Sequence, residues 1–219
     1  MNRLYNAVML DFRSAKSILP PFALVLGIAV FIGVVTKQPF VTIVMAMMVA
    51  SQVGSTIFQV NEKNNLDKLY GILPLRKFER AMARYLYALI LGVCSVVFAT
   101  VAALILYRAL DIKMDTLPFL TVLGLAFVYY CFSVSVLYPI LIRFSFSKAF
   151  AFSIIPILLM FFLVYFFATN AGFLSAASKI VPFFAAHMYL IILCCVGLGL
   201  ALLLVSLSIT YPLCKKKEL

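Results

Sequence analysis

Long apolar runs, separated by short polar stretches, occupy most of this 219-residue chain. About 20 residues in helix span the hydrocarbon of a bilayer, and each run is close to that length or longer. Unbroken runs indicate helices, because barrel strands alternate between apolar and polar positions. We therefore expect an all-α membrane protein that forms one transmembrane domain over residues 1–219. Its six transmembrane helices are expected at Ile18–Thr36, Phe40–Val60, Ala81–Tyr107, Leu117–Ile142, Ala149–Thr169 and Phe183–Leu213.

Residues 1–17 precede the first predicted span. We expect them to form an interfacial helix, which lies on the membrane surface. At 100° per residue, Leu4, Tyr5, Val8 and Phe12 fall on one arc, and most of the basic residues fall on the other. In the alternative interpretation, the same stretch is a frayed tail. No small-residue cleavage site follows the first span and more spans do, so we expect that span to be retained.

The polar connections between the spans differ greatly in length. Lys37–Pro39 is very short and predicts that the first two spans form an antiparallel hairpin. The segment 61–80 is the longest polar stretch, and within it Leu66, Leu69 and Leu73 recur at helical spacing. This spacing predicts a short helix with one apolar face. Such a helix either lies on lipid or docks into a groove on a soluble partner.

Charge is distributed unevenly between the two predicted sides of the membrane. Six spans place both termini on one side, which then holds fourteen of the eighteen lysines and arginines. Cytoplasmic loops carry such an excess, so both termini are expected to be cytoplasmic in a plasma-membrane protein. The net charge of +11 therefore reflects topology and attraction to anionic lipid, and we expect no nucleic-acid partner.

Motifs for nucleotide and metal chemistry are absent from the sequence. No glycine is followed by Lys-Ser or Lys-Thr, so the chain has no P-loop and we expect it not to be an enzyme. The single histidine, His187, has no second histidine at metal-binding spacing, and the five cysteines form no CxxC pair. We expect the chain to contain no catalytic residue, no cofactor and no metal site.

The acidic residues all fall outside the predicted apolar cores, including Asp11 near the N-terminus. Carriers that are driven by protons or sodium usually keep a carboxylate at membrane depth, because the ion needs a charged or titratable ligand there. The sequence offers none, which argues against an ion-coupled carrier.

A polar stripe marks the second span, where Gln52, Ser55, Thr56 and Gln59 share one helical face. Two buried amides that faced lipid would cost free energy, so this face is expected to meet another helix or a wet cavity. Hydrogen bonds between helices are one interpretation, and a wall of a substrate path is the other.

Two further patterns concern packing within the bundle. Aromatic residues surround Pro156 in the fifth span, where they either pack the bundle or form a hydrophobic gate. Gly197 and Ala201 form a small-residue pair in the sixth span and are expected to allow close helix packing. An interior this apolar suits a lipid or an amphipathic peptide better than a sugar or an ion.

Three short motifs lie in and beside the polar segment 61–80. They are Phe58 with Asn-Glu-Lys-Asn-Asn at 61–65, Leu-Pro-Leu-Arg at 73–76, and Ala-Arg-Tyr at 83–85. Together they resemble the cytoplasmic loop of ABC-2-type transporter permeases. The similarity is greatest to a small bacterial branch that includes permeases of phenol-soluble-modulin exporters. The six spans, the interfacial helix and the basic tail agree with that family along the whole chain.

The resemblance implies that the segment 61–80 contains a coupling helix, which docks onto a separate ATPase subunit. ATP and Mg would be bound by that subunit, and two permease copies, or this chain with a related permease, would form the membrane unit. Lipid and a peptide or hydrophobic substrate would be the other partners. The residues implied in the ATPase contact are Glu62, Lys63, Asn64, Asn65, Leu66, Asp67, Leu69, Tyr70, Leu73, Pro74 and Arg76, with Arg143 and Lys148 in a second, smaller contact.

The function that the resemblance implies is ATP-driven export of amphipathic or antimicrobial peptides, or of other hydrophobic compounds. A different class of protein stays open as the alternative. In that alternative, the chain is a membrane anchor, a signalling protein or a peptide-immunity protein that acts by binding alone. A neighbouring reading frame that encodes a P-loop ATPase would favour the transporter, because the chain itself carries no nucleotide-binding motif.

Overall fold

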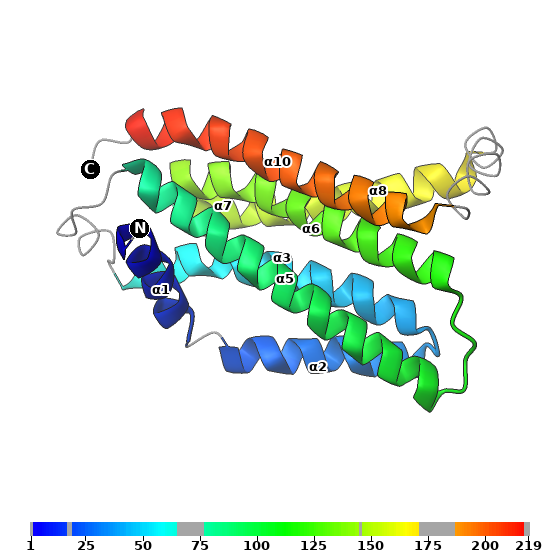
Figure 1. The fold of residues 1–219 in the computed structure, drawn as a ribbon. Helices are drawn as coiled ribbons and strands as arrows, with labels where there is room; N and C mark the ends of the chain where they lie inside the picture. Colours follow the sequence, from blue (N-terminus) through cyan, green and yellow to red (C-terminus); the bar gives the residue numbers. More distant parts are fainter. Residues whose placement is uncertain (1, 17–18, 65–76, 145, 171–186, 217–219) are drawn as a thin grey trace.

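The computed structural model describes residues 2–16, 19–64, 77–144, 146–170 and 187–216, and every regular element in these ranges is a helix (Figure 1). In chain order the elements are α1 (Asn2–Ala15), α2 (Leu19–Val35), α3 (Pro39–Lys63), α5 (Lys77–Ala109), α6 (Thr116–Arg143), α7 (Phe146–Ala149), the 3₁₀ helix η2 (Phe150–Ser153), α8 (Ile154–Thr169) and α10 (Met188–Lys216).

Four helices are long and apolar enough to cross a membrane, namely α3, α5, α6 and α10. A fifth span is counted if α1 and α2 are taken together. With 17 and 16 residues, α2 and α8 are shorter than the roughly 20 residues that a bilayer requires. The all-helical prediction is confirmed for the described residues, whereas the number of six spans stays a prediction.

The hairpin between α2 and α3 forms where the sequence predicts it. Lys37 adopts a positive φ of 54°, which turns the chain, and Pro39 then starts α3. Proline suits the first position of a helix, because its missing N–H would have no partner there. Gly33 lies against Thr42, and a Cβ on Gly33 would come within 2.0 Å of the Thr42 hydroxyl oxygen.

The helices extend further into the predicted polar segment 61–80 than the sequence indicated. Residues Asn61 to Lys63 continue α3, and α5 begins at Lys77, four residues before the predicted span. Lys63 lies in the last turn of α3, where its positive charge interacts favourably with the negative end of the helix dipole. Residues 65–76, which hold the expected coupling helix, lie outside the described residues.

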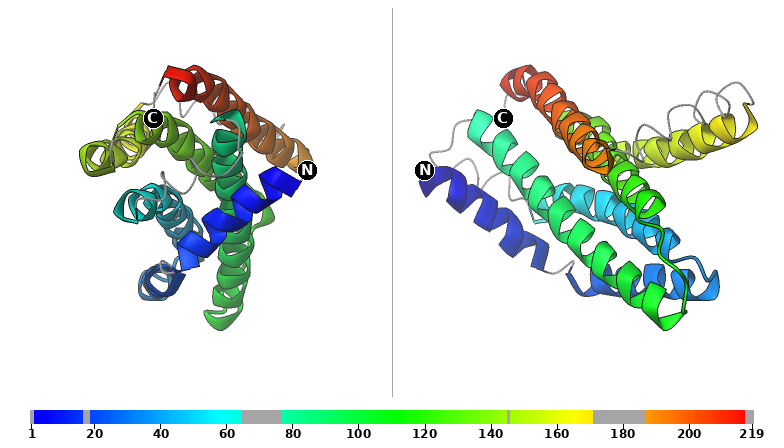
Figure 2. Two further views of the ribbon diagram at one scale, coloured as in Figure 1. Left: turned by 90° about the vertical axis from the view of Figure 1, so that its left-hand side faces the viewer. Right: turned by 45° about the vertical axis from the view of Figure 1, so that its right-hand side comes forward.

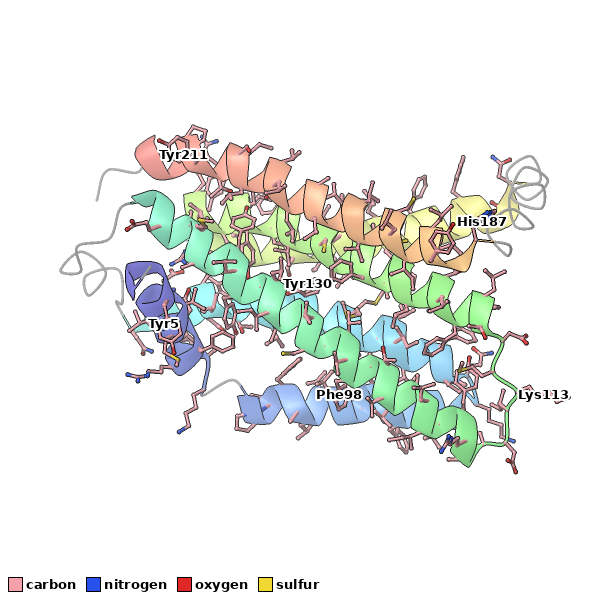
Figure 3. The ribbon with its side chains drawn as sticks, in the orientation of Figure 1. Tyr5, Phe98, Lys113, Tyr130, His187 and Tyr211 are labelled. Carbon is pink, nitrogen blue, oxygen red and sulfur yellow. The ribbon has the colours of Figure 1, made fainter. Side chains whose placement is uncertain are left out.

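Helix α6 lies at the centre of the fold and packs against α3, α5 and α10. Tyr130 of α6 is buried against α5 and donates a hydrogen bond of 2.5 Å to the carbonyl of Ala88 in that helix (Figure 3). Tyr138, also buried, donates to the carbonyl of Gly54 at 3.1 Å. Gly92 makes room for the Tyr130 ring, because a Cβ there would lie 2.4 Å from a ring carbon.

The contact between α6 and α10 uses a different face of α10 from the one predicted. A Cβ on Gly197 would meet nothing within 4 Å, and Ala201 is exposed, so this pair makes no close contact with another described helix of this chain. Instead, Gly199 lies against Cys131, and Cys195 lies against Gly124. Small residues let the two backbones approach in this way.

Helix α8 diverges from the other helices along its length (Figure 2). The side chains of Phe161 and Phe162 are 63% and 65% exposed, and Phe166 is exposed as well. Phe161, Phe162 and Phe166 therefore do not pack inside the bundle of this chain. In a membrane they face lipid or another protein, since apolar surface of this kind is not left in water. The side chains of Phe150, Tyr165 and Phe167 lie outside the described residues, so their part in packing stays a prediction.

Candidate functional site

One end of the bundle gathers most of the residues for which the sequence predicts a role, and we call it the terminal end. It carries both chain termini, with α1 lying obliquely across the other helices (Figures 1 and 2). The C-terminal ends of α3 and α6 and the N-terminal end of α5 lie there too. The described residues that flank the segment 65–76 therefore lie at the same end as the connection between α6 and α7.

Glu62 joins two of the segments expected to contact an ATPase. Its Oε2 accepts a hydrogen bond of 2.6 Å from the backbone N–H of Phe146, the first residue of α7. The first N–H groups of a helix have no partner within the helix, and a bond to a carboxylate is charge-assisted. The end of α3 and the connection at 143–148 are thus held together, although 84 residues separate the two partners.

The other predicted contact residues divide between exposed and undescribed positions. Lys63, Asn64 and Arg143 are exposed at the terminal end, and the Arg143 guanidinium carbon lies 5.5 Å from the centroid of the Phe144 ring. Their role in binding an ATPase stays a prediction. The remaining predicted residues have side chains outside the described part of the chain: Asn65, Leu66, Asp67, Leu69, Tyr70, Leu73, Pro74, Arg76 and Lys148.

Arg84 is held inside the protein and does not extend to the surface as a lipid anchor. It is 8% exposed, and its guanidinium carbon lies 4.4 Å from the centroid of the Phe58 ring. Phe58 packs edge-to-face on Tyr138, which in turn packs on Tyr85. A cation over an aromatic face is attracted by the ring quadrupole, so this cluster ties α5 to α3 and α6.

Asp11 is a buried acidic residue that lies outside the predicted apolar spans, on α1. It is 1% exposed on the face of α1 that packs against α5. Beside it, the rings of Phe12 and Tyr87 pack edge-to-face with centroids 4.9 Å apart. At 100° per residue Asp11 lies at the edge of the apolar arc of α1, and α1 packs against the bundle through that edge. Tyr5 and Met9, on another face, are exposed.

The buried carboxylate lies on α1 at the terminal end, outside the spans of α5, α6 and α10. The apolar spans of α5, α6 and α10 contain no Asp or Glu in the ranges Ala81–Ala109, Thr116–Arg143 and Tyr189–Leu213. The lack of a carboxylate in these three spans therefore still argues against an ion-coupled carrier.

The polar stripe of α3 is used for hydrogen bonds within the protein. The Gln52 side-chain nitrogen donates to the carbonyl of Ser153 in η2 at 3.3 Å. Ser55 and Thr56 donate to backbone carbonyls of α3 itself, at 2.6 Å and 2.7 Å. Gln59 is half-buried on the same helix. For Gln52, the interpretation as a contact between helices is therefore supported, and a role of the stripe in a substrate path stays a prediction.

A hydroxyl cluster between α5 and α10 was missed in the sequence. The Tyr85 hydroxyl shares hydrogen bonds with Ser206 at 2.6 Å and with Thr210 at 2.9 Å. Ser206 also donates to the carbonyl of Ser135 in α6 at 2.7 Å. Ser206 and Thr210 are spaced i, i+4 on an otherwise apolar helix, which is the signal that could have revealed this contact.

Metal binding finds no support in the part of the chain that the structure describes. No group of three or more His, Cys, Asp or Glu residues lies close enough to hold an ion there. His187 lies at the start of α10, at the opposite end of the bundle from the termini, where its ring contacts Tyr189 (Figure 3).

These features define a multi-pass helical membrane protein whose connections gather polar and basic residues at one end. The family model described as "ABC-2 family transporter protein" matches residues 8–214, and the chain belongs to this family. It is therefore a membrane permease of an ABC transporter, and the family implies an ABC ATPase subunit as its partner. Comparison with curated proteins and with solved structures gave no match.

Proposed function

We propose that this chain is the membrane-spanning subunit of an ATP-driven exporter, and that its ATPase partner binds the terminal end. The observation that carries the proposal is the hydrogen bond between Glu62 and Phe146, within a chain of the ABC-2 family. It holds the two segments expected to contact the ATPase side by side. A single soluble subunit could therefore contact both.

The positions of α3 and α5 explain how movement of the ATPase would reach the membrane. These two helices flank the segment 65–76, and both pack against α6. A partner that binds this segment differently with and without ATP shifts the equilibrium between helix arrangements. ATP and Mg would stay in the partner, because the chain has no P-loop of its own.

The apolar surface of the chain supports an assembly with a second permease, either another copy or a related chain. Large hydrophobic side chains are exposed along α2, α5, α8 and α10. Lipid would cover part of this surface and the second permease another part. The substrate path would lie between the two bundles. Both termini would be cytoplasmic, as the distribution of basic residues indicates.

The cargo is proposed to be an amphipathic or antimicrobial peptide, or another hydrophobic compound. An apolar path lined by a few hydroxyls and amides suits a molecule with both apolar and polar faces. The candidate polar wall is the stripe of α3 that contains Gln59. If Gln59→Leu leaves transport unchanged in a folded complex, this residue has no role in the path.

The test is reconstitution of the chain with its ATPase in lipid vesicles. We expect ATP hydrolysis to be stimulated by the permease, and a labelled amphipathic peptide to cross the membrane only when ATP is hydrolysed. The matched control is an ATPase variant that binds ATP without hydrolysing it. If the chain binds the peptide without any ATPase, the alternative of an anchor or immunity protein is favoured.

A further inference from the structure

The segment 146–153, formed by α7 and η2, is fastened to α3 at both of its ends. At its start, the Phe146 N–H donates to Glu62 at 2.6 Å. At its finish, the Ser153 carbonyl accepts from Gln52 at 3.3 Å. Between these points Ala149 is fully buried. We call this segment the strap.

The two contacts fit the lengths of the two segments that they join. Gln52 and Glu62 are ten residues apart on α3, which corresponds to a rise of about 15 Å. The strap covers about 12 Å, at about 1.5 Å per α-helical residue and 2.0 Å per 3₁₀ residue. It therefore runs along α3 in the opposite chain direction, starting at the terminal end.

The strap also contains a break in the helix that leads into α8. Its last four residues are 3₁₀, and Pro156 follows in the first turn of α8. Proline has no N–H to bond to the carbonyl one turn earlier, and this explains why the α-helix does not continue through Phe152. A short 3₁₀ stretch inside a helix is often the site of a hinge. Beyond the break, α8 is exposed along much of its surface.

We propose that the strap couples movement of the C-terminal end of α3 to α8, and we call this coupling the latch. Glu62 is its positioning residue. Glu62 would thus act through the Phe146 amide and not by touching the ATPase. Because the chain is proposed to be driven by an ATPase, the latch builds on that proposed function. A push on the segment that follows α3 moves Glu62, and the strap passes this movement to α8.

The chemistry of the bond defines an informative series of variants. Glu62→Ala removes the carboxylate that accepts from the Phe146 N–H. Glu62→Gln keeps an acceptor of the same shape but removes the charge, and bonds to charged groups are about twice as strong as neutral ones. Lys63→Ala, one residue further along and exposed, is the matched control. Gln52→Leu releases the other end of the strap.

The first measurement is hydrogen–deuterium exchange of the peptide that contains the Phe146 amide, with the purified chain in lipid nanodiscs. We expect this amide to exchange about tenfold faster or more in Glu62→Ala. We expect an intermediate rate in Glu62→Gln and the wild-type rate in Lys63→Ala. Unchanged exchange in Glu62→Ala would overturn the latch, whatever the ATPase does. Should Glu62→Ala fail to fold, Glu62→Gln decides the same point.

The second measurement is the amount of peptide transported per ATP in the reconstituted complex. We expect the number of peptides transported per ATP hydrolysed to fall severalfold in Glu62→Ala. This ratio is compared because it does not depend on how much ATPase is bound. Wild-type transport per ATP in Glu62→Ala would overturn the latch and leave the proposed function intact. A wild-type chain that stimulates no ATPase would instead contradict the proposed function.

Discussion

Helices α6 and α8 are joined by a short connection, yet their surroundings differ completely. Helix α6 buries large side chains such as Tyr130, Leu137 and Tyr138 between α3, α5 and α10. Helix α8 exposes rings such as Phe161 and Phe162, although it is just as apolar. Hydrophobic composition alone therefore does not show whether a helix is buried in the bundle or exposes its surface to lipid or another protein.

The polar groups of the two regions explain the difference. In α6, the buried hydroxyls of Tyr130 and Tyr138 donate hydrogen bonds to carbonyls of neighbouring helices, those of Ala88 and Gly54. The segment that precedes α8 is tied to α3 by the hydrogen bonds that Glu62 and Gln52 of α3 make with the strap. In a bilayer, where apolar contact alone gives little preference for protein over lipid, these bonds and close packing hold helices together.

The largest expected effect comes from removing an aromatic ring of the α3–α6 contact. Phe58→Ala leaves a cavity beside Tyr138 and takes away the ring under Arg84. We expect the free energy of unfolding to fall by about 3 kcal/mol or more. Phe161→Ala in α8 is the control and should change it by less than about 0.5 kcal/mol. The measurement is denaturation of the chain in mixed micelles, and equal losses for both variants would abolish the distinction.

A smaller effect is expected where two helix backbones approach. Gly92→Ala forces a methyl group against the Tyr130 ring, and overpacking of this kind typically costs about 1–3 kcal/mol. Gly197→Ala adds the same group on the open face of α10, where nothing lies within 4 Å. Thermal unfolding should therefore shift for the first variant and stay in place for the second. A shift for Gly197→Ala would mean that α10 packs through the face first predicted.

The smallest effect concerns a single hydroxyl. Tyr85→Phe keeps the ring on Tyr138 but removes the hydrogen bonds to Ser206 and Thr210. We expect a loss of about 1 kcal/mol in unfolding free energy. Tyr189→Phe, which is exposed at the other end of α10, serves as the control. Identical stability of the Tyr85→Phe variant and the wild type would show that the hydroxyl cluster contributes nothing.

The sequence predicts the helices of this fold well because their signal is local. Apolar runs set where each helix lies, and Lys37–Pro39 sets the first hairpin. The orientation of α10 could not be predicted in the same way. That helix is apolar on nearly all sides, so Gly197 and Gly199 look equivalent until the position of Cys131 in α6 is known.

The candidate site shows the same limit. The stripe on α3 indicated correctly that Gln52 meets another element, because an amide in an apolar run needs a partner. The partner of Glu62 could not be inferred, since the bond joins residues 84 positions apart and one of them contributes only its backbone. The burial of Asp11 depends in turn on how α1 packs against α5.

The central claim is that this permease is driven by a separate ATP-hydrolysing subunit bound at its terminal end. The most direct measurement is purification of the tagged full-length chain from its native membrane under mild conditions, followed by assay of ATP hydrolysis and identification of the bound subunits. We predict a stoichiometric P-loop ATPase that is lost when the exposed basic residues Lys63 and Arg143 are replaced together. Recovery of an intact, folded chain without any ATP-binding protein would contradict the account.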